Sequence, residues 1–264
     1  MADLLTVKNL KVDFSLDGRV VHAVEGVDLR LERNETVVLA GESGSGKTIT
    51  ALALTGILPS NAAVKAGEVI LEGENILGLS EKRLSLIRGA KIAYIFQEPT
   101  SYLNPVYTIG EQISEVIMQH QGLGRQEAGE KAGELLAQVQ ISDTGRVFRS
   151  YPHQLSGGMN QRVFIAMALA CRPAIIIADE PTTSLDVTIE AQILKLLVEL
   201  KEKTGFSLLF ITHNLAIAKK IAARIYVMYR GKIVEEGYCG QIFENPAHFH
   251  TKELIAAYHK IGRL

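Results

Sequence analysis

Short runs of apolar, β-branched residues recur along the chain, each bounded by turn-forming residues, and such runs predict β-strands. The runs occupy residues 4–8, 37–40, 92–96, 175–178 and 208–211. Their apolarity is continuous rather than alternating, which is typical of strands buried on both faces of a parallel sheet covered by helices. Farther along, residues 225–229 and 232–235 flank Arg230-Gly231 and predict a hairpin.

Helical patterns lie between the strand runs, most clearly at residues 163–170 and 189–201. Residues 98–160 are polar, favour helices and contain no strong strand run, so they interrupt the strand series. We interpret this segment as a helical insertion into an α/β core. No internal repeat or low-complexity tract marks a further domain.

Composition and charge exclude several classes of protein. The chain has 264 residues with 28 Lys and Arg against 29 Asp and Glu, a net charge of -1, which argues against a basic nucleic-acid surface or a polybasic membrane mode. The two cysteines, Cys171 and Cys239, exclude a disulfide scaffold. No stretch reaches the ~18 apolar residues of a membrane span, and residues 1–4 do not resemble an export signal. We expect a cytoplasmic protein, although its mean hydropathy of +0.13 is high for one.

Residues 41–48 (GESGSGKT) match the phosphate-binding pattern G-x-x-x-x-G-K-[ST] between a predicted strand and a predicted helix. Glycines there let backbone N–H groups converge on phosphate oxygens, and the helix N-terminus adds the positive end of its dipole. A lysine in this position reaches the β- and γ-phosphates, and the following hydroxyl can ligate Mg²⁺. The alternative is a glycine-rich turn that matches by accident. The predicted phosphate-binding residues are Gly41, Ser43, Gly44, Ser45, Gly46, Lys47 and Thr48.

The apolar strand run at 175–178 ends in two acids, Asp179 and Glu180. In open α/β sheets, ligands bind at the carboxyl ends of the strands. Asp179 is therefore placed to hold Mg²⁺, and Glu180, which points elsewhere, can polarise an attacking water. The alternative is a pair of solvated acids that cap a helix starting at Pro181.

A second candidate anion site lies at residues 155–162 (LSGGMNQR). Ser156, Gly157 and Gly158 open a helix that we expect from about Met159 to Cys171, and they offer a hydroxyl and N–H groups to an anion. Taken alone, Ser156 is more simply an N-cap preceding a glycine turn.

Together these segments resemble the ATP-binding cassette (ABC) ATPases, over nearly the whole chain and in the family's order. Residues 184–186 (SLD) follow the carboxylate strand, and Gln97 and His213 each follow a strand run, as the family's Q-loop glutamine and switch histidine do. The resemblance implies a P-loop NTPase fold of the ABC type, α/β in class. Its core sheet is mostly parallel, with an N-terminal antiparallel β part and a helical subdomain. One domain would span 1–240, with a RecA-like core at about 1–97 and 163–240, a helical subdomain at about 98–162, and a tail at 241–264.

The resemblance also implies roles for individual residues, with ATP and Mg²⁺ as cofactors. Glu180 would be the general base, His213 the γ-phosphate sensor, and Gln97 a contact to Mg²⁺ or the attacking water. Thr48, Gln97 and Asp179 would be the Mg²⁺ ligands. Ser156, Gly157 and Gly158, with Asp186, would close over ATP held by a second cassette. Phe14 would stack on adenine, although a core position in the first sheet is an equal alternative.

Longer stretches resemble the dipeptide, oligopeptide and nickel importer branch of the family. They are residues 96–99 with 103–105, 151–154, 166–173 and 178–187. Met159 replaces the family's more usual glutamine but also occurs in peptide-type importers. The tail lacks the cysteine-rich extension of many peptide members and so favours the nickel members slightly. His248, His250 and Cys239 do not have a diagnostic metal-site spacing.

The branch implies partners and a location. These are two polytopic membrane permease subunits docking at about residues 98–108, a second ABC ATPase subunit joined head to tail, and an extracellular or periplasmic substrate-binding protein, without nucleic acid. The location would be the cytoplasmic face of the inner membrane. Two alternatives remain: a soluble ABC ATPase not tied to transport, and a degenerate cassette that holds ATP without cutting it.

Overall fold

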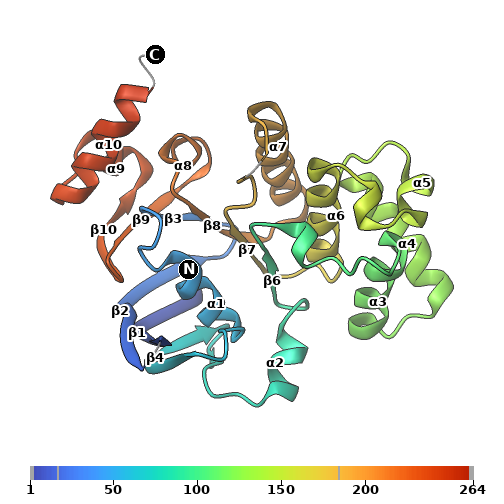
Figure 1. Cartoon of the computed structure of the whole chain (residues 1–264), viewed down its shortest axis with the longest axis horizontal. Helices are drawn as coiled ribbons and strands as arrows, with labels where there is room; N and C mark the ends of the chain where they lie inside the picture. The colour runs from blue at the N-terminus through green and yellow to red at the C-terminus, as the bar shows by residue number, and fades with distance from the viewer. Residues whose placement is uncertain (1–2, 17, 184, 262–264) are drawn as a thin grey trace. The chain divides into compact units, whose positions relative to one another are not determined.

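The computed structural model describes residues 3–16, 18–183 and 185–261. These residues form two compact units (Figure 1). The first contains the described residues up to Leu84 and those from Ser207 onward, and the second is Ser85–Phe206. Helix α2 (Glu81–Ile87) carries the chain from one to the other. The predicted boundaries near residues 97, 162 and 240 stay a prediction.

An antiparallel sheet begins the first unit, with strand order β2-β1-β4-β5. Its strands are β1 (Asp3–Leu16), β2 (Arg19–Glu32), β4 (Ala62–Leu71) and β5 (Glu74–Asn75). Buried Leu5, Val7, Leu10 and Val12 line β1, and register shifts in both of its pairings mark bulges. Polar residues alternate with apolar ones along much of these strands, as expected of a sheet with one face toward solvent.

The same unit holds a second, mostly parallel sheet with strand order β10-β9-β3-β8. β3 (Thr36–Ala40) pairs in parallel with β8 (Ser207–Thr212) and β9 (Arg224–Tyr229), and β9 pairs antiparallel with β10 (Lys232–Tyr238). Every residue of β3 and β8 is buried and the two strands are parallel, as predicted from the runs at 37–40 and 208–211, and the β9–β10 hairpin is confirmed. The run at 4–8 instead belongs to antiparallel β1, so its assignment to a parallel sheet is wrong. The helices of this unit are α1 (Lys47–Thr55), α8 (Leu215–Ile221), α9 (Cys239–Glu244) and α10 (Phe249–Ile261).

The second unit pairs β6 (Ile92–Ile95) in parallel with β7 (Ile175–Asp179). Helices α3, α4 and α5 come between these two strands in the sequence. In the structure they pack on one another, as the predicted helical insertion requires (Figure 1). Helix α6 begins at Gly157 because Ser156 itself is the N-cap, and it ends at Leu169, so both ends lie two residues earlier than predicted. The helices are α3 (Ile109–Gln121), α4 (Arg125–Gln138), α5 (Thr144–Arg149), α6 (Gly157–Leu169) and α7 (Val187–Thr204), with short 3₁₀ turns at Pro99–Ser101 and Pro152–Gln154.

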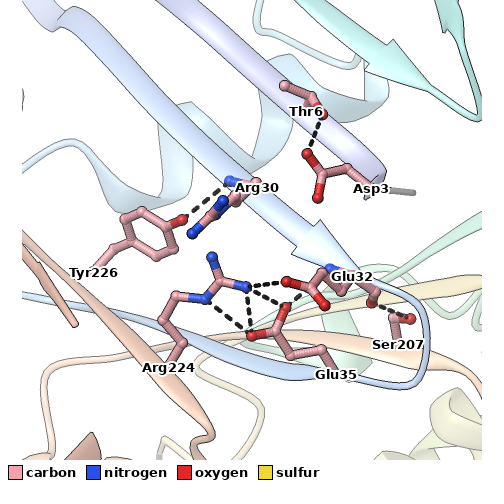
Figure 2. Close-up of polar contacts among 8 residues, drawn as sticks. All are labelled: Asp3, Thr6, Arg30, Glu32, Glu35, Ser207, Arg224 and Tyr226. Carbon is pink, nitrogen blue, oxygen red and sulfur yellow. Dashed lines mark hydrogen bonds and ion pairs between the residues drawn. The ribbon is translucent and has the colours of Figure 1, made fainter. Parts of the chain in front are cut away.

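A buried ion-pair network ties together the amino ends of β3, β8 and β9 (Figure 2). The Arg224 guanidinium lies against Glu35 at 2.8 Å and Glu32 at 3.2 Å, and the Ser207 hydroxyl donates to the Glu32 carbonyl. The Tyr226 hydroxyl accepts from the Arg30 backbone N–H at 3.2 Å. A charge this deeply buried is tolerated only when it is paired. The network therefore fixes the strand ends opposite to those that carry the phosphate-binding loop.

Apolar residues that raise the mean hydropathy are largely inside the two units. β3, β7 and β8 are buried along their whole length. None of the helices in the described ranges is both long and apolar enough to span a bilayer. Some large apolar side chains are exposed, among them Tyr102, Val106 and Tyr107 in the segment that follows β6.

Candidate functional site

The predicted phosphate-binding loop joins β3 to α1 in the first unit, and its backbone leaves no room for side chains at two glycines. A Cβ at Gly41 would lie 2.2 Å from the Met228 carbonyl oxygen. One at Gly46 would lie 2.5 Å from the Ala23 carbonyl oxygen, and the φ of Gly46 is +106°. Gly44, at φ +77°, meets nothing within 4 Å. The first two glycines are therefore required by packing, and Gly44 by backbone conformation.

Lys47 is buried and already bonded to the loop. Its ammonium donates to the carbonyls of Gly41 at 2.9 Å and Glu42 at 2.8 Å. The Ser45 hydroxyl is buried without a hydrogen-bond partner among the described residues. Ser43 and Thr48 are exposed. The loop thus concentrates positive charge and polar groups at one helix end, in the manner of a phosphate site.

The N-terminus of α1 differs from those of α6 and α7. Its N-cap is Gly46, and no side chain among the described residues caps it. By contrast, Ser156 caps α6 and Asp186 caps α7. The first N–H groups of a helix need an acceptor, so the start of α1 fits an anionic ligand such as a phosphate.

The turn between β9 and β10 supports the loop, a contact that the sequence did not indicate. The Gly231 N–H donates to the Ser45 carbonyl at 2.9 Å, and its own carbonyl accepts from the Glu25 N–H at 2.8 Å. The Thr50 hydroxyl donates to the Gly46 carbonyl at 2.9 Å. The loop is therefore held from β2, from the hairpin turn and from its own helix.

His213 follows β8 at the sheet edge where the loop follows β3. Ala40 and Thr212 are paired in the parallel register, so Gly41 and His213 both come directly after paired residues. His213 is exposed. The Asn214 side chain next to it accepts from the Ala216 N–H and caps α8. The structure thus brings the predicted phosphate loop and switch histidine to one edge.

Phe14, the candidate adenine contact, lies near the end of β1. It pairs with Val21 of β2 and Ala62 of β4. The side chain is half-buried, so it is not among the fully buried core residues of this sheet. Its role in binding a base stays a prediction.

In the second unit, Asp179 ends β7 and is only 4% exposed. The Tyr94 hydroxyl donates to its Oδ2 at 2.8 Å. Burial, with the nearby Asp179 carboxylate, raises the pKa of Tyr94, so the phenol stays protonated as a donor. Ile95 pairs with Ala178, so Gln97, which is exposed, leaves the sheet at the same edge as the two acids.

Glu180 sits in a turn with φ +44°, a left-handed conformation that is unfavourable for a residue with a side chain. The Thr183 hydroxyl donates to its Oε2 at 3.0 Å, and the Thr183 N–H donates to its carbonyl. Helix α7 begins only at Val187, with Asp186 as N-cap. The alternative in which the two acids cap a helix starting at Pro181 is therefore wrong. Backbone strain and a dedicated donor instead fix the direction of this carboxylate.

The second candidate anion site opens α6 in the same unit. The Ser156 hydroxyl accepts from the Met159 N–H at 3.3 Å, so it does cap the helix. A Cβ at Gly158 would lie 2.8 Å from Ile189 of α7, whereas Gly157 is exposed. Asp186 accepts from the Ile189 N–H at 2.9 Å, and Ser184 lies outside the described residues. Packing alone thus explains Gly158, and capping explains Ser156 and Asp186 whether or not they meet a nucleotide.

The predicted metal ligands are oxygen donors, and they suit a Mg²⁺ ion shared with a bound phosphate better than a metal ion coordinated by protein side chains alone. Within the described part of the chain, no three His, Cys, Asp or Glu side chains are grouped to hold a metal ion. His250 instead packs on Tyr229, with ring centroids 4.0 Å apart. Mg²⁺ is usually bound by one or two carboxylates with waters and substrate phosphates. In the second unit the carboxylate of Asp179 and the amide of Gln97 supply oxygen donors of that kind, and in the first unit the hydroxyl of Thr48 supplies another. That the three share one ion stays a prediction.

Comparison with known proteins finds relatives over the whole chain. The glutathione import ATP-binding protein GsiA of Salmonella typhi is 49% identical over 268 residues, which cover 99% of this chain and 43% of that protein. The protein of the same name from Escherichia coli K12 is 46% identical with the same coverage. The chain therefore spans less than half the length of the curated relatives it matches.

Solved structures share the fold. The ATP-binding cassette MJ0796, in a dimeric post-hydrolysis state bound to ADP and Pi, matches with a TM-score of 0.79 at 30% identity, covering 89% of this chain and 98% of that one. The structure of cbiO1 from Clostridium perfringens, part of the ABC transporter complex cbiONQ, matches with a TM-score of 0.78 at 25% identity, covering 100% and 98%. The family model described as ABC transporter matches residues 24–183. The predicted α/β fold and family are confirmed: the chain belongs to the ABC transporter family, and it is an ABC ATPase domain with the fold of the ATP-binding cassettes.

Proposed function

We propose that the chain is the ATP-hydrolysing subunit of an importer, coupling ATP hydrolysis to uptake of small peptides. The observation that carries the proposal is the loop before α1. It combines a helix start that no side chain in the described ranges caps, a buried lysine and glycines that keep side chains out. Such a loop binds phosphate. An acid in a strained turn, Glu180, adds the means to cut the bound triphosphate.

In this proposal the loop N–H groups and Lys47 bind the β- and γ-phosphates, and Thr48, Asp179 and Gln97 hold Mg²⁺. Lys47 exchanges its bonds to the loop carbonyls for bonds to phosphate oxygens, because a buried ammonium must keep anionic or carbonyl partners. When bound, Mg²⁺ neutralises charge on the phosphates. Phe14 is the proposed contact to the base.

Glu180 is the proposed general base for hydrolysis. It accepts a proton from the water whose oxygen attacks the γ-phosphorus, and the bond to the β–γ bridging oxygen breaks to leave ADP. Thr183 keeps the carboxylate oriented through its 3.0 Å hydrogen bond. His213 senses the γ-phosphate, and Gln97 contacts the metal or the water.

Membership of the family supports a paired arrangement. In our proposal Ser156, Gly157, Gly158 and Asp186 of one cassette close over ATP held by a second ABC ATPase subunit, in a head-to-tail sandwich. MJ0796 is a cassette with a described dimeric structure. Two polytopic membrane permease subunits and an extracellular or periplasmic substrate-binding protein complete the transporter. This chain lies at the cytoplasmic face of the inner membrane, with the exposed segment around Tyr102 and Tyr107 facing the permease.

The relatives favour peptide over nickel as cargo. They are named for import of glutathione, a small peptide. Uptake of labelled glutathione, of a dipeptide and of nickel by cells with and without this gene tests the choice. The proposal expects loss of peptide uptake, and selective loss of nickel uptake would replace peptide by nickel. Purification of the tagged chain from detergent-extracted membranes should recover polytopic membrane proteins, and their absence would contradict the importer role.

Phosphate release from ATP by the purified chain tests the enzymatic part. Lys47→Ala should weaken ATP binding by about 10- to 100-fold, the equivalent of losing charged hydrogen bonds of about 1.5–3 kcal/mol. Lys195→Ala is the matched control, because that lysine is 78% exposed and forms a surface ion pair with Glu199 on the same helix. Wild-type protein that binds ATP and releases no phosphate would instead support the degenerate cassette.

A further inference from the structure

A hydrogen bond joins two neighbouring strands at the predicted Mg²⁺ carboxylate. The Tyr94 hydroxyl on β6 donates to Oδ2 of Asp179 on β7 at 2.8 Å. Tyr94 is paired in register with Ile177, two residues before Asp179. Side chains two residues apart on a strand share a face, as do paired residues on neighbouring strands. The sheet register itself therefore places the phenol beside the carboxylate.

A cluster of aromatic rings, with Phe96 tilted against the Tyr94 ring, holds Tyr94 in place. Its ring lies 4.4 Å from that of Phe96, which in turn stacks on Tyr102 at 3.7 Å with an interplanar angle of 12°. Phe164 of α6 meets Phe96 edge-on at 6.0 Å. Aromatic pairs of this kind contribute beyond the area they bury. The phenol therefore has a fixed position, which a hydroxyl must have in order to orient a neighbour.

The bond constrains a group that the proposed function uses. A donor to Oδ2 restricts rotation of the Asp179 carboxylate about Cβ–Cγ, and so fixes the place of Oδ1 as well. Hydrogen bonds to a carboxylate are stronger than neutral ones. Removing a group that hydrogen-bonds to a metal ligand without contacting the metal typically lowers metal affinity by about 10- to 100-fold.

We propose that Tyr94 is a positioning residue that orients Asp179 toward the Mg²⁺ of bound Mg–ATP, with the stack of Phe96 and Tyr102 fixing the phenol. The inference rests on the proposed function, since it assumes that Asp179 meets Mg²⁺. It adds a residue that none of the sequence motifs contains. It also predicts that Tyr94 acts on metal binding rather than on the nucleotide itself.

Binding of a fluorescent, non-hydrolysable ATP analogue with excess Mg²⁺ and with EDTA measures this effect without catalysis. The ratio of the two affinities reports the contribution of the metal. Tyr94→Phe deletes one oxygen and keeps the ring, so the ratio should fall about 10-fold or more while affinity in EDTA stays at the wild-type value. An unchanged ratio in folded Tyr94→Phe protein overturns the proposal.

Tyr226→Phe is the matched control. It deletes the same atom from a buried tyrosine, whose hydroxyl accepts from the Arg30 N–H in the first unit. It should lower stability and leave the Mg²⁺ ratio alone, and an equal fall in both variants would overturn the proposal. If Tyr94→Phe does not fold, Tyr102→Leu decides, because Tyr102 is 55% exposed and its loss should loosen the stack. It should lower the ratio in the same direction, and no fall overturns the proposal.

The wild-type protein separates this inference from the function on which it rests. If the wild type fails to bind the analogue, the proposed function fails. If it binds with a metal contribution that Tyr94→Phe retains, only the role of Tyr94 fails.

Discussion

Two glycines of the phosphate-binding loop differ in the space around them, so their alanine variants separate the cost of backbone strain from the cost of crowding. At Gly46 a methyl group would lie 2.5 Å from the Ala23 carbonyl oxygen and 2.8 Å from Met228 Cε, whereas ordinary contacts begin at 3.4 Å. At Gly44 it would meet nothing within 4 Å. Both residues have positive φ, +106° and +77°, so both alanine variants carry backbone strain. Only Gly46→Ala adds a collision with backbone.

The two variants should therefore lose different amounts of unfolding free energy. Backbone strain at Gly46 costs about 1–3 kcal/mol, and displacing packed atoms adds about 1–3 kcal/mol, so Gly46→Ala should lose about 2–6 kcal/mol. Gly44→Ala should lose only about 1–2 kcal/mol from the left-handed conformation. Urea unfolding followed by circular dichroism, without nucleotide, measures both. A loss for Gly46→Ala no larger than that for Gly44→Ala would refute the packing argument.

Further predictions concern the ion-pair network and two helix caps. Glu35→Ala should cost about 1.5–3 kcal/mol of unfolding free energy, because it removes the charged hydrogen bonds of Arg224 to Glu35 and leaves Glu32 as its carboxylate partner, and a loss below about 1 kcal/mol would contradict that role. Ser156→Ala should cost about 1 kcal/mol in thermal or urea unfolding, and no loss would show that the cap is unimportant. Hydrogen bonds from the Thr108 N–H and hydroxyl lower the pKa of Glu111 below its ordinary value of 4.5. This capping box therefore stabilises α3 fully when the pH is above 4.5, and the stabilisation is lost as the pH falls through the lowered pKa of Glu111. Thr108→Ala should raise that pKa part of the way back in an NMR titration, and an unmoved pKa would be evidence against the hydroxyl's share.

Structural features that are determined by a run of consecutive residues could be predicted from the sequence. The strands β3, β7 and β8 are continuous apolar runs because both of their faces are buried, and the loop at 41–48 is a contiguous motif. Strands β2 and β4 were not located from their residues. Polar side chains on their exposed face interrupt the apolar pattern, and bulges in the β1 pairings shift its period.

Contacts between distant residues could not be predicted. Gly231 supports Ser45, and Tyr94 meets Asp179, only because the strand register brings them together. A single sequence contains no signal for such pairs. The motif also did not reveal the left-handed backbone of Glu180, which the following turn imposes. The sequence motifs thus supplied the candidate groups for the chemistry, and the structure added the side chains and backbone groups that contact them.

The role of Glu180 as general base is tested by Glu180→Gln, with ATP binding and steady-state phosphate release measured on the same protein. The matched control is Glu202→Gln, because Glu202 is exposed on α7. We expect unchanged ATP affinity and a fall in turnover of about 10²- to 10⁴-fold, the usual contribution of a general base, with the control unaffected. Normal steady-state hydrolysis by Glu180→Gln protein would show that Glu180 is not the general base.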